Sequence, residues 1–201
     1  MALFARAAEI GGAVAIRANG PADIRAIHRA TSLPIIGINK IRNQHWQVFI
    51  TPSLRSARPL IGAGASIVAV DATPRSRPGG LGPAEFIHLL TRELGVPVMA
   101  DVATLDEGLA AADAGASLVA TTLAGYTDAR PPTQGPDLEL LAELAARCPV
   151  PVICEGRIHS PEQLAAAFAA GAYAVVVGNA ITNPTVITRL YAARAKRART
   201  P

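Results

Sequence analysis

Three stretches of this sequence share one pattern, in which a proline leads through apolar residues to a charged end: Pro34–Lys40 (PIIGINK), Pro97–Asp101 (PVMAD) and Pro151–Glu155 (PVICE). Short apolar runs bounded by turn residues are typical of strands that are buried on both faces, as in a parallel sheet. The pattern therefore predicts three buried parallel strands, each with a charged residue at its carboxyl end.

A second kind of stretch alternates with the first. Each begins with Gly-Ala and crosses a short run of Val, Ile, Leu or Ala, and the four begin at Gly12, Gly64, Gly115 and Gly171. Successive starts are 52, 51 and 56 residues apart, which is the length of two strand–helix units and indicates an internal repeat. We therefore predict an α/β fold, a TIM (β/α)8-type barrel, in a single domain over residues 1–201.

The number of predicted strands is one fewer than such a barrel needs. The seven candidates begin at Gly12, Leu33, Gly64, Val96, Gly115, Val150 and Gly171. We expect the barrel to lack its first strand in this chain, which would leave two strand edges unpaired and a gap in the wall.

The polar strand ends are predicted to share one face, because side chains alternate along a strand with a period of two. Even offsets from the prolines place together Lys40, Asp101 and Glu155. Odd offsets from the Gly-Ala starts do the same for Arg17, Asp71, Thr122 and Gly178. Because such barrels carry their active sites at the carboxyl ends of the strands, these residues predict a polar cavity there.

Composition excludes several classes of protein. The chain has 201 residues, of which 50% are hydrophobic and 17% charged, as expected for one globular domain. No apolar run approaches the roughly 20 residues that span a bilayer, so we expect no membrane association. Residues 1–10 lack the apolar core and cleavage site of a secretory leader, and we therefore expect a cytoplasmic protein.

The net charge of +4 raises the question of nucleic acid, which we do not expect to be a partner. The basic residues are spread along the chain except near the C-terminus, and no stripe of aromatic residues accompanies them. Residues 190–201 are predicted to be a basic C-terminal helix end or tail, where cations favour a helix terminus.

Metal and disulfide chemistry are not expected either. The two cysteines, Cys148 and Cys154, are predicted to be reduced thiols. The four histidines are scattered, and no pair has the spacing of metal ligands. We predict neither a metal nor an organic cofactor.

Lysine usage singles out one residue. Of the 19 basic residues, only Lys40 and Lys196 are lysine. An ammonium group can lose its proton when it is desolvated, whereas a guanidinium stays protonated, so Lys40 is the candidate base at the cavity. The alternatives, chance or a surface lysine beyond the strand end, stay open on this observation alone.

The last two strand ends carry glycines that suit phosphate binding. Glu155-Gly156-Arg157 ends one strand, and Gly178-Asn179 follows the next. Barrels often bind phosphate at this place through backbone N–H groups. A glycine that only serves a turn with positive φ is the alternative, and Arg157 favours a ligand.

Eight blocks, in order and at ordinary spacing, resemble the N-acetylmannosamine-6-phosphate 2-epimerase family. The resemblance runs from about residue 11 to residue 188. The blocks are Ala15–Gly20, Leu33–Lys40, Thr51-Pro52, Asp71–Thr73 with Arg77-Pro78, Met99–Asp101, Thr121–Thr127, Cys154–Ile158 and Val177–Thr182.

The resemblance implies the interconversion of N-acetyl-D-mannosamine 6-phosphate and N-acetyl-D-glucosamine 6-phosphate in sialic acid breakdown, without a cofactor. It implies Lys40 as catalytic base and Glu155 as its acid/base partner. The substrate-binding residues would be Arg17, Asp101, Thr122, Tyr126 and Arg77. The phosphate-binding residues would be Gly156, Arg157, Gly178 and Asn179. The expected partner is a small sugar phosphate, and a homodimer is possible because an open barrel favours association.

Two departures from the family pattern are visible. Family members begin with a further strand that ends in Gln, and they usually have Arg where this chain has Asn183. Arg189 and Arg157 are the candidates to replace that cation. Two alternatives remain: another phosphate-binding barrel enzyme, similar to thiamin-phosphate synthases or histidine-pathway isomerases, and an inactive barrel that only binds sugar phosphate.

Overall fold

The computed structural model describes residues 1–199, and the side chains of residues 1–195. All seven predicted strands are present, and they form one parallel sheet in chain order. Each begins two to four residues after its predicted start, because the Gly-Ala and Pro positions belong to the preceding turns. The strands are β1 Ile16–Asn19, β2 Ile35–Ile38, β3 Ile67–Asp71, β4 Val98–Asp101, β5 Leu118–Ala120, β6 Val152–Glu155 and β7 Ala174–Val176.

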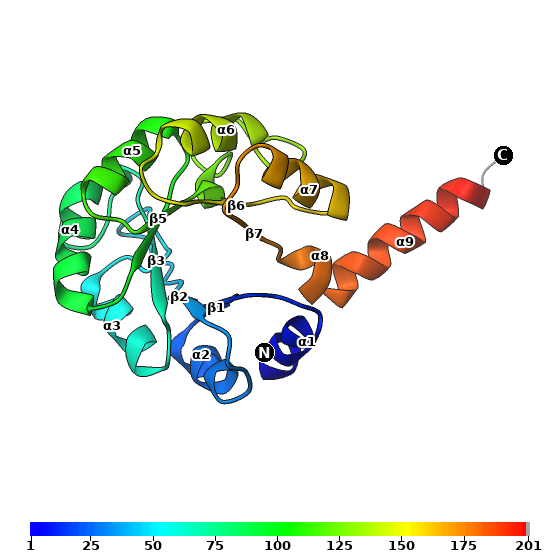
Figure 1. Ribbon diagram of the computed structural model, residues 1–201, viewed down its shortest axis with the longest axis horizontal. Coiled ribbons are helices and arrows are strands. Elements are labelled where there is room, and N and C mark those ends of the chain that lie inside the picture. Colours follow the sequence, from blue (N-terminus) through cyan, green and yellow to red (C-terminus); the bar gives the residue numbers. More distant parts are fainter. Residues whose placement is uncertain (200–201) are drawn as a thin grey trace.

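Helices alternate with the strands and lie outside the curved sheet (Figure 1). Several begin at a side-chain cap of the kind that stabilises a first turn, as at Ser53, Thr104 and Ser160. The helices are α1 Ala2–Ile10, α2 Pro21–His28, α3 Leu54–Gly62, α4 Pro83–Leu94, α5 Leu105–Asp113, α6 Leu138–Arg147, α7 Pro161–Ala169, α8 Asn179–Thr182 and α9 Pro184–Arg199, with the short 3₁₀ helix η1 at Thr121–Leu123.

The sheet curves into a barrel that is not closed. β1 and β7 are the two ends of the strand order, and the part of the chain that the structure describes places no strand between them. Figure 1 shows this opening between the β1 side and the β7 side of the ring. The predicted (β/α) barrel with a gap in its wall is confirmed.

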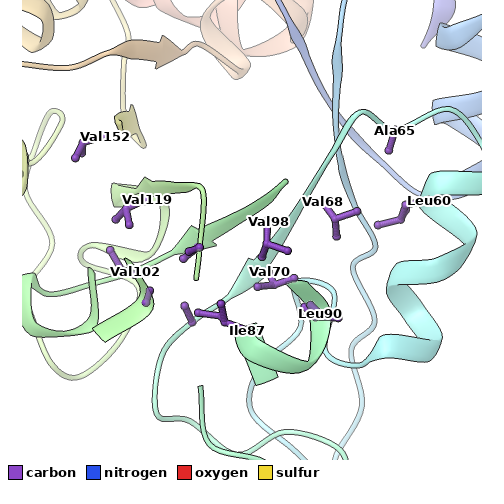
Figure 2. Packing of buried hydrophobic residues seen from close by; sticks show 14 of the residues in the cluster. Leu60, Ala65, Val68, Val70, Ile87, Leu90, Val98, Val102, Val119 and Val152 are labelled. Carbon is purple, nitrogen blue, oxygen red and sulfur yellow. The ribbon is translucent and has the colours of Figure 1, made fainter. Parts of the chain in front are cut away.

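Two apolar layers confirm the predicted alternation of side chains. The outer layer lies between strands and helices, and Figure 2 shows part of it, with Val68, Val70 and Val98 beside Leu60, Ile87 and Leu90. The inner layer fills the barrel with residues that include Ile36, Ile38, Ala69, Met99, Ala120 and Ile153. Because Lys40, Asp71, Asp101, Thr122 and Glu155 have the parity of this inner set, they belong to the interior face.

The last helix, α9, leaves the ring and extends away from it (Figure 1). Residues 190–199 of the predicted basic segment lie in α9, and residues 200–201 lie outside the described part of the chain. Within residues 1–199, none of the helices combines the length and the apolar character that crossing a membrane requires.

Gly37 of β2 is closely packed against its neighbours, so a substitution there measures how tightly this strand fits. A Cβ at this position would lie 2.8 Å from the Ala65 Cβ and 3.1 Å from the Ile24 Cδ1. We expect Gly37→Ala to lower the free energy of unfolding by about 1–3 kcal/mol, because overpacking forces the neighbours apart. Urea denaturation measures the change. The control is Gly62→Ala, since a Cβ there meets nothing within 4 Å, and equal stability of the two variants would contradict the prediction.

Candidate active site

A cavity of about 460 Å³ lies at the carboxyl ends of the strands. Eight of the predicted site residues line it: Lys40, Thr122, Tyr126, Glu155, Gly156, Arg157, Gly178 and Asn179. The other lining residues are Arg42, Phe49, Ile50, Leu123, Ile158, His159 and Val176. The predicted convergence of these segments on one cavity is present in the structure.

One arginine pairs with two carboxylates at the floor of this site. Arg17 donates to both oxygens of Asp101, at 3.0 and 2.6 Å, and its Nη1 lies 2.8 Å from the Glu155 Oε2. The side chains of Arg17 and Asp101 are 8% and 0% exposed, and that of Glu155 is 19% exposed. Burial alone would lower the pKa of Arg17, but the two carboxylates raise it. Arg17 therefore carries a permanent positive charge beneath the cavity.

Glu155 is the carboxyl of this cluster that can hold a proton. Burial raises its pKa and the charge of Asp101 adds to this, whereas Arg17 acts in the opposite direction. The Thr122 hydroxyl lies 2.8 Å from the Asp101 Oδ1 and 3.3 Å from the Glu155 Oε2. Because a hydroxyl has one proton and Asp101 is the nearer acceptor, a protonated Glu155 can donate in turn to Thr122.

The backbone of Glu155 is held by the neighbouring strand end. The Thr121 hydroxyl accepts from the Glu155 N–H and donates to the Glu155 carbonyl oxygen, both at 3.0 Å. Thr121 is buried. This pair of bonds continues the contact between β5 and β6 beyond the last regular pairing and aims Glu155 at the cavity.

Lys40 lies two residues after the end of β2 and lines the same cavity as Glu155, which ends β6. Its N–H donates to the Asn19 Oδ1 at 2.8 Å, and it forms an isolated antiparallel bridge with Ile50. Asn19 ends β1, so the backbone of Lys40 is fixed by the neighbouring strand as well as by the loop that follows it.

Arg157 adopts an unusual conformation and holds a loop. Its φ of 56° lies in the left-handed region, directly after Gly156 with a φ of 114°. The guanidinium donates to the carbonyl oxygens of Ala124 and Gly135 and to the Thr133 hydroxyl, and it lies 5.3 Å from the ring centroid of Tyr126. Three of its five N–H groups are thus engaged by the segment between β5 and α6.

Arg77 is not at the cavity, so the geometry does not support its predicted contact with substrate. It is 5% exposed, lies 4.6 Å from the Phe86 ring, and donates to the carbonyl oxygens of Asp71 and Thr73. Burial lowers its pKa. The proline- and glycine-rich loop turns this side chain inward against α4 because the ring of Phe86 and two free carbonyls are available there.

Asp71 shares the interior face but not the cavity. Its carboxylate accepts from the N–H and hydroxyl of Thr73 and from Arg75, at 2.6 to 3.0 Å. Burial raises the pKa of Asp71, although these donors oppose the change. The residue is therefore used to order the loop after β3, and Arg75 is engaged in the same contact.

Two cavity residues were missed by the sequence reasoning, Arg42 and His159. Arg42, like Lys40, has an even offset from Pro34, so extending the alternation by two residues would have found it. Its guanidinium lies 4.2 Å from the Phe49 ring centroid. His159 comes from the turn before α7, where periodicity gives no signal.

Neither a metal ligand set nor a disulfide is formed by the described residues. Within residues 1–199, no group of three or more His, Cys, Asp or Glu side chains is arranged to hold a metal ion. Cys148 and Cys154 are free, and burial raises the pKa of the Cys154 thiol.

The chain matches a known family over almost all of its length. A family model described as "Putative N-acetylmannosamine-6-phosphate epimerase" (NanE) matches residues 1–197. The chain belongs to this family.

Relatives and solved structures agree with that assignment. Proteins named "Putative N-acetylmannosamine-6-phosphate 2-epimerase" from Caldanaerobacter subterraneus subsp. tengcongensis and Cutibacterium acnes are 50% and 51% identical, over 95% and 94% of this chain and 81% and 82% of theirs. The N-acetylmannosamine-6-phosphate 2-epimerase structure from Clostridium perfringens has a TM-score of 0.90 and 42% identity, over 96% of this chain and 83% of that one. A thiamine phosphate pyrophosphorylase from Pyrococcus furiosus, with a TM-score of 0.62, is 18% identical over 89% of this chain and 79% of its own, and shares the fold.

Because the pKa of Glu155 is raised, we expect Glu155→Gln to stabilise the folded protein by an amount that depends on pH. Below the ordinary value of 4.5 the carboxyl is protonated in both folded and unfolded states. As pH rises through the higher folded value, the folded state must release a proton at a cost, so wild-type stability falls relative to Glu155→Gln by on the order of 1 kcal/mol.

Thermal unfolding between pH 4 and pH 8 measures this difference. We expect the Tm of Glu155→Gln to exceed that of the wild type at pH 8 and the two to converge near pH 4. Glu162→Gln on the exposed face of α7 is the control and should show no gain over the wild type at pH 8, because hydrogen bonds lower the pKa of Glu162. A variant less stable than the wild type at pH 8 would mean that pairing with Arg17 outweighs burial.

Proposed function

We propose that this chain interconverts N-acetyl-D-mannosamine 6-phosphate and N-acetyl-D-glucosamine 6-phosphate by moving a proton at C2. The observation that carries the proposal is the presence of Lys40 and Glu155 on one cavity, in a chain of the epimerase family. Lys40 follows β2 and Glu155 ends β6, and these two strands are well separated in the strand order. They can therefore approach a sugar from different sides.

The chemistry needs two groups that exchange protons. The C2–H bond of the sugar is acidic only beside the C1 carbonyl, so the reaction proceeds on the open-chain form. Lys40 takes the C2 proton and the bonding electron pair moves to the carbonyl oxygen, which becomes an enolate. Glu155, whose raised pKa favours the protonated form, returns a proton to the opposite face of C2.

The floor of the proposed site is formed by Arg17, Asp101 and Thr122. Arg17 holds Asp101 and Glu155 in fixed positions, and the Thr122 hydroxyl links the same two carboxyls. The buried Arg17 cation also lies beneath the cavity, where it would stabilise negative charge that develops on the sugar, as preorganised cations assist enolate formation. Tyr126 lines the cavity beside them and completes the proposed sugar contacts.

The phosphate end of the substrate is assigned to the last two strand ends. Gly156, Arg157, Gly178 and Asn179 all line the cavity, and two N–H groups of Arg157 are not engaged by the loop. Asn183, which stands where the family usually has Arg, caps the end of α8 and accepts from the Val186 N–H. Arg42 is the further cation at the cavity, and Arg189 is not among the lining residues.

The family relationship also suggests a setting, which is amino sugar and sialic acid catabolism. A cytoplasmic location and the absence of nucleic acid partners remain predictions from the sequence. An inactive sugar-phosphate binder is the less favoured alternative, because both proposed proton-transfer residues are retained at the cavity.

Proton exchange at C2 tests the function directly. The purified chain is incubated with N-acetylmannosamine 6-phosphate in D₂O and followed by NMR. We expect N-acetylglucosamine 6-phosphate deuterated at C2, formed at least about 10²–10⁴-fold more slowly by Lys40→Ala because the general base is lost. Lys196→Ala, which removes the other lysine of the chain, is the matched control and should keep the wild-type rate. No exchange from a folded wild-type chain would refute the proposal.

We further propose that the chain forms a homodimer. On α9, Leu190 and Tyr191 are 57% and 76% exposed, and the main contacts of this helix are with α8. A helix gains most of its stability from packing an apolar face, so a second copy would supply the missing surface. Sedimentation equilibrium should show a dimer that Leu190→Glu weakens. A monomer at all concentrations would contradict this proposal.

A further inference from the structure

The segment Phe49–Thr51 is inserted between the ends of two barrel strands. β2 and β3 pair directly only at Ile36 with Ile67 and at Gly37 with Val68. Beyond this point the segment takes over the pairing on both sides. The Ile41 N–H donates to the Phe49 carbonyl oxygen at 2.9 Å, and Lys40 bridges Ile50.

The other side of the same segment contacts β3. The Asp71 N–H donates to the Ile50 carbonyl oxygen at 3.1 Å. The chain that follows β2 thus returns as a short wedge between Lys40 and β3. The position of this wedge determines where the backbone of Lys40 lies relative to the rest of the barrel.

Thr51 is the residue that ties the wedge to both strands. Its N–H donates to the Asn39 carbonyl oxygen at 2.9 Å, and its hydroxyl accepts from the Asn39 N–H at 3.1 Å. The same hydroxyl donates to the Ala69 carbonyl oxygen of β3 at 2.7 Å. The Thr51 side chain therefore connects the ends of β2 and β3 at a point where the two strands no longer pair directly.

The conformation of Thr51 shows that the surrounding structure imposes this contact. Its φ is 46°, in the left-handed region, and the residue is fully buried. A β-branched residue rarely adopts this conformation, and such residues persist only where neighbouring contacts enforce them. Among the described residues other than glycine, only Thr51 and Arg157 have a positive φ, and both adjoin the cavity residues.

We propose that Thr51 is a positioning residue for Lys40, which directs the amine into the cavity through the hydroxyl bridge between Asn39 and Ala69. The inference rests on the proposed function, since it concerns the base of that reaction. Without the hydroxyl, the Asn39 N–H and the Ala69 carbonyl are left unpaired in a buried place, and the strand end must move to satisfy them. A shift of that kind moves the neighbouring Lys40.

Steady-state kinetics on two variants test the proposal. Thr51→Val keeps the branched shape and removes the hydroxyl, whereas Thr51→Ser keeps the hydroxyl. We expect Thr51→Val to lower kcat by about 10–100-fold with KM within about 3-fold of the wild type, because misplacement of about 1 Å costs up to 10²-fold. Thr51→Ser should retain most of the activity. Thr104→Val removes a hydroxyl that caps α5 and should lower the Tm but not kcat.

A second measurement does not depend on turnover. ¹³C methylation of the amines labels the N-terminal amine and the two lysines, and Lys196 serves as an internal reference for Lys40. We expect Thr51→Val to shift the Lys40 signal while that of Lys196 stays unchanged, and Thr104→Val to move neither signal.

The two readouts separate this inference from the proposed function. An unchanged Lys40 signal in folded Thr51→Val, or a kcat within 2-fold of an active wild type, would overturn the role of Thr51. A wild-type chain without epimerase activity would refute the function, and the Lys40 signal would still decide whether Thr51 positions that side chain.

Discussion

The site depends on one buried cation shared by two carboxylates. Arg17 of β1 binds both oxygens of Asp101 on β4 and also reaches Glu155 on β6. Separating these charges would leave an unpaired charge in the interior, which is strongly destabilising. The contact therefore ties together three strands that are distant in sequence, across the inside of an open barrel.

This arrangement also sets the chemical properties of the two carboxyls. Asp101 has both oxygens paired with Arg17 and receives the Thr122 hydroxyl, so its charge is well compensated. Glu155 shares only the remaining part of the same cation, and burial raises its pKa. The two carboxyls of the cluster thus have different surroundings, and those of Glu155 fit its proposed role in proton exchange.

Two buried threonines hold the strand ends that carry the proposed proton-transfer residues. Thr121 bonds both backbone groups of Glu155, and Thr51 bonds both backbone groups of Asn39, next to Lys40. In each case a hydroxyl extends strand pairing past the last regular pair. The backbone groups at both strand ends are therefore paired with the two threonines, which holds these ends in place beside the cavity.

The sequence by itself determined the strand order, the alternation and the family, because buried parallel strands are apolar runs with a fixed period of two. It therefore also identified Lys40, Glu155, Arg17, Asp101 and Thr122 as residues of one face. Only the tertiary structure decided that Arg77 turns away onto Phe86 and that Asp71 binds its own loop. It also decided that Arg42 lines the cavity and that the Thr51 hydroxyl bonds to β3. Those outcomes depend on how the loops fold back on the strands. The loops are irregular, so the period of two that orders side chains along a strand does not predict their contacts.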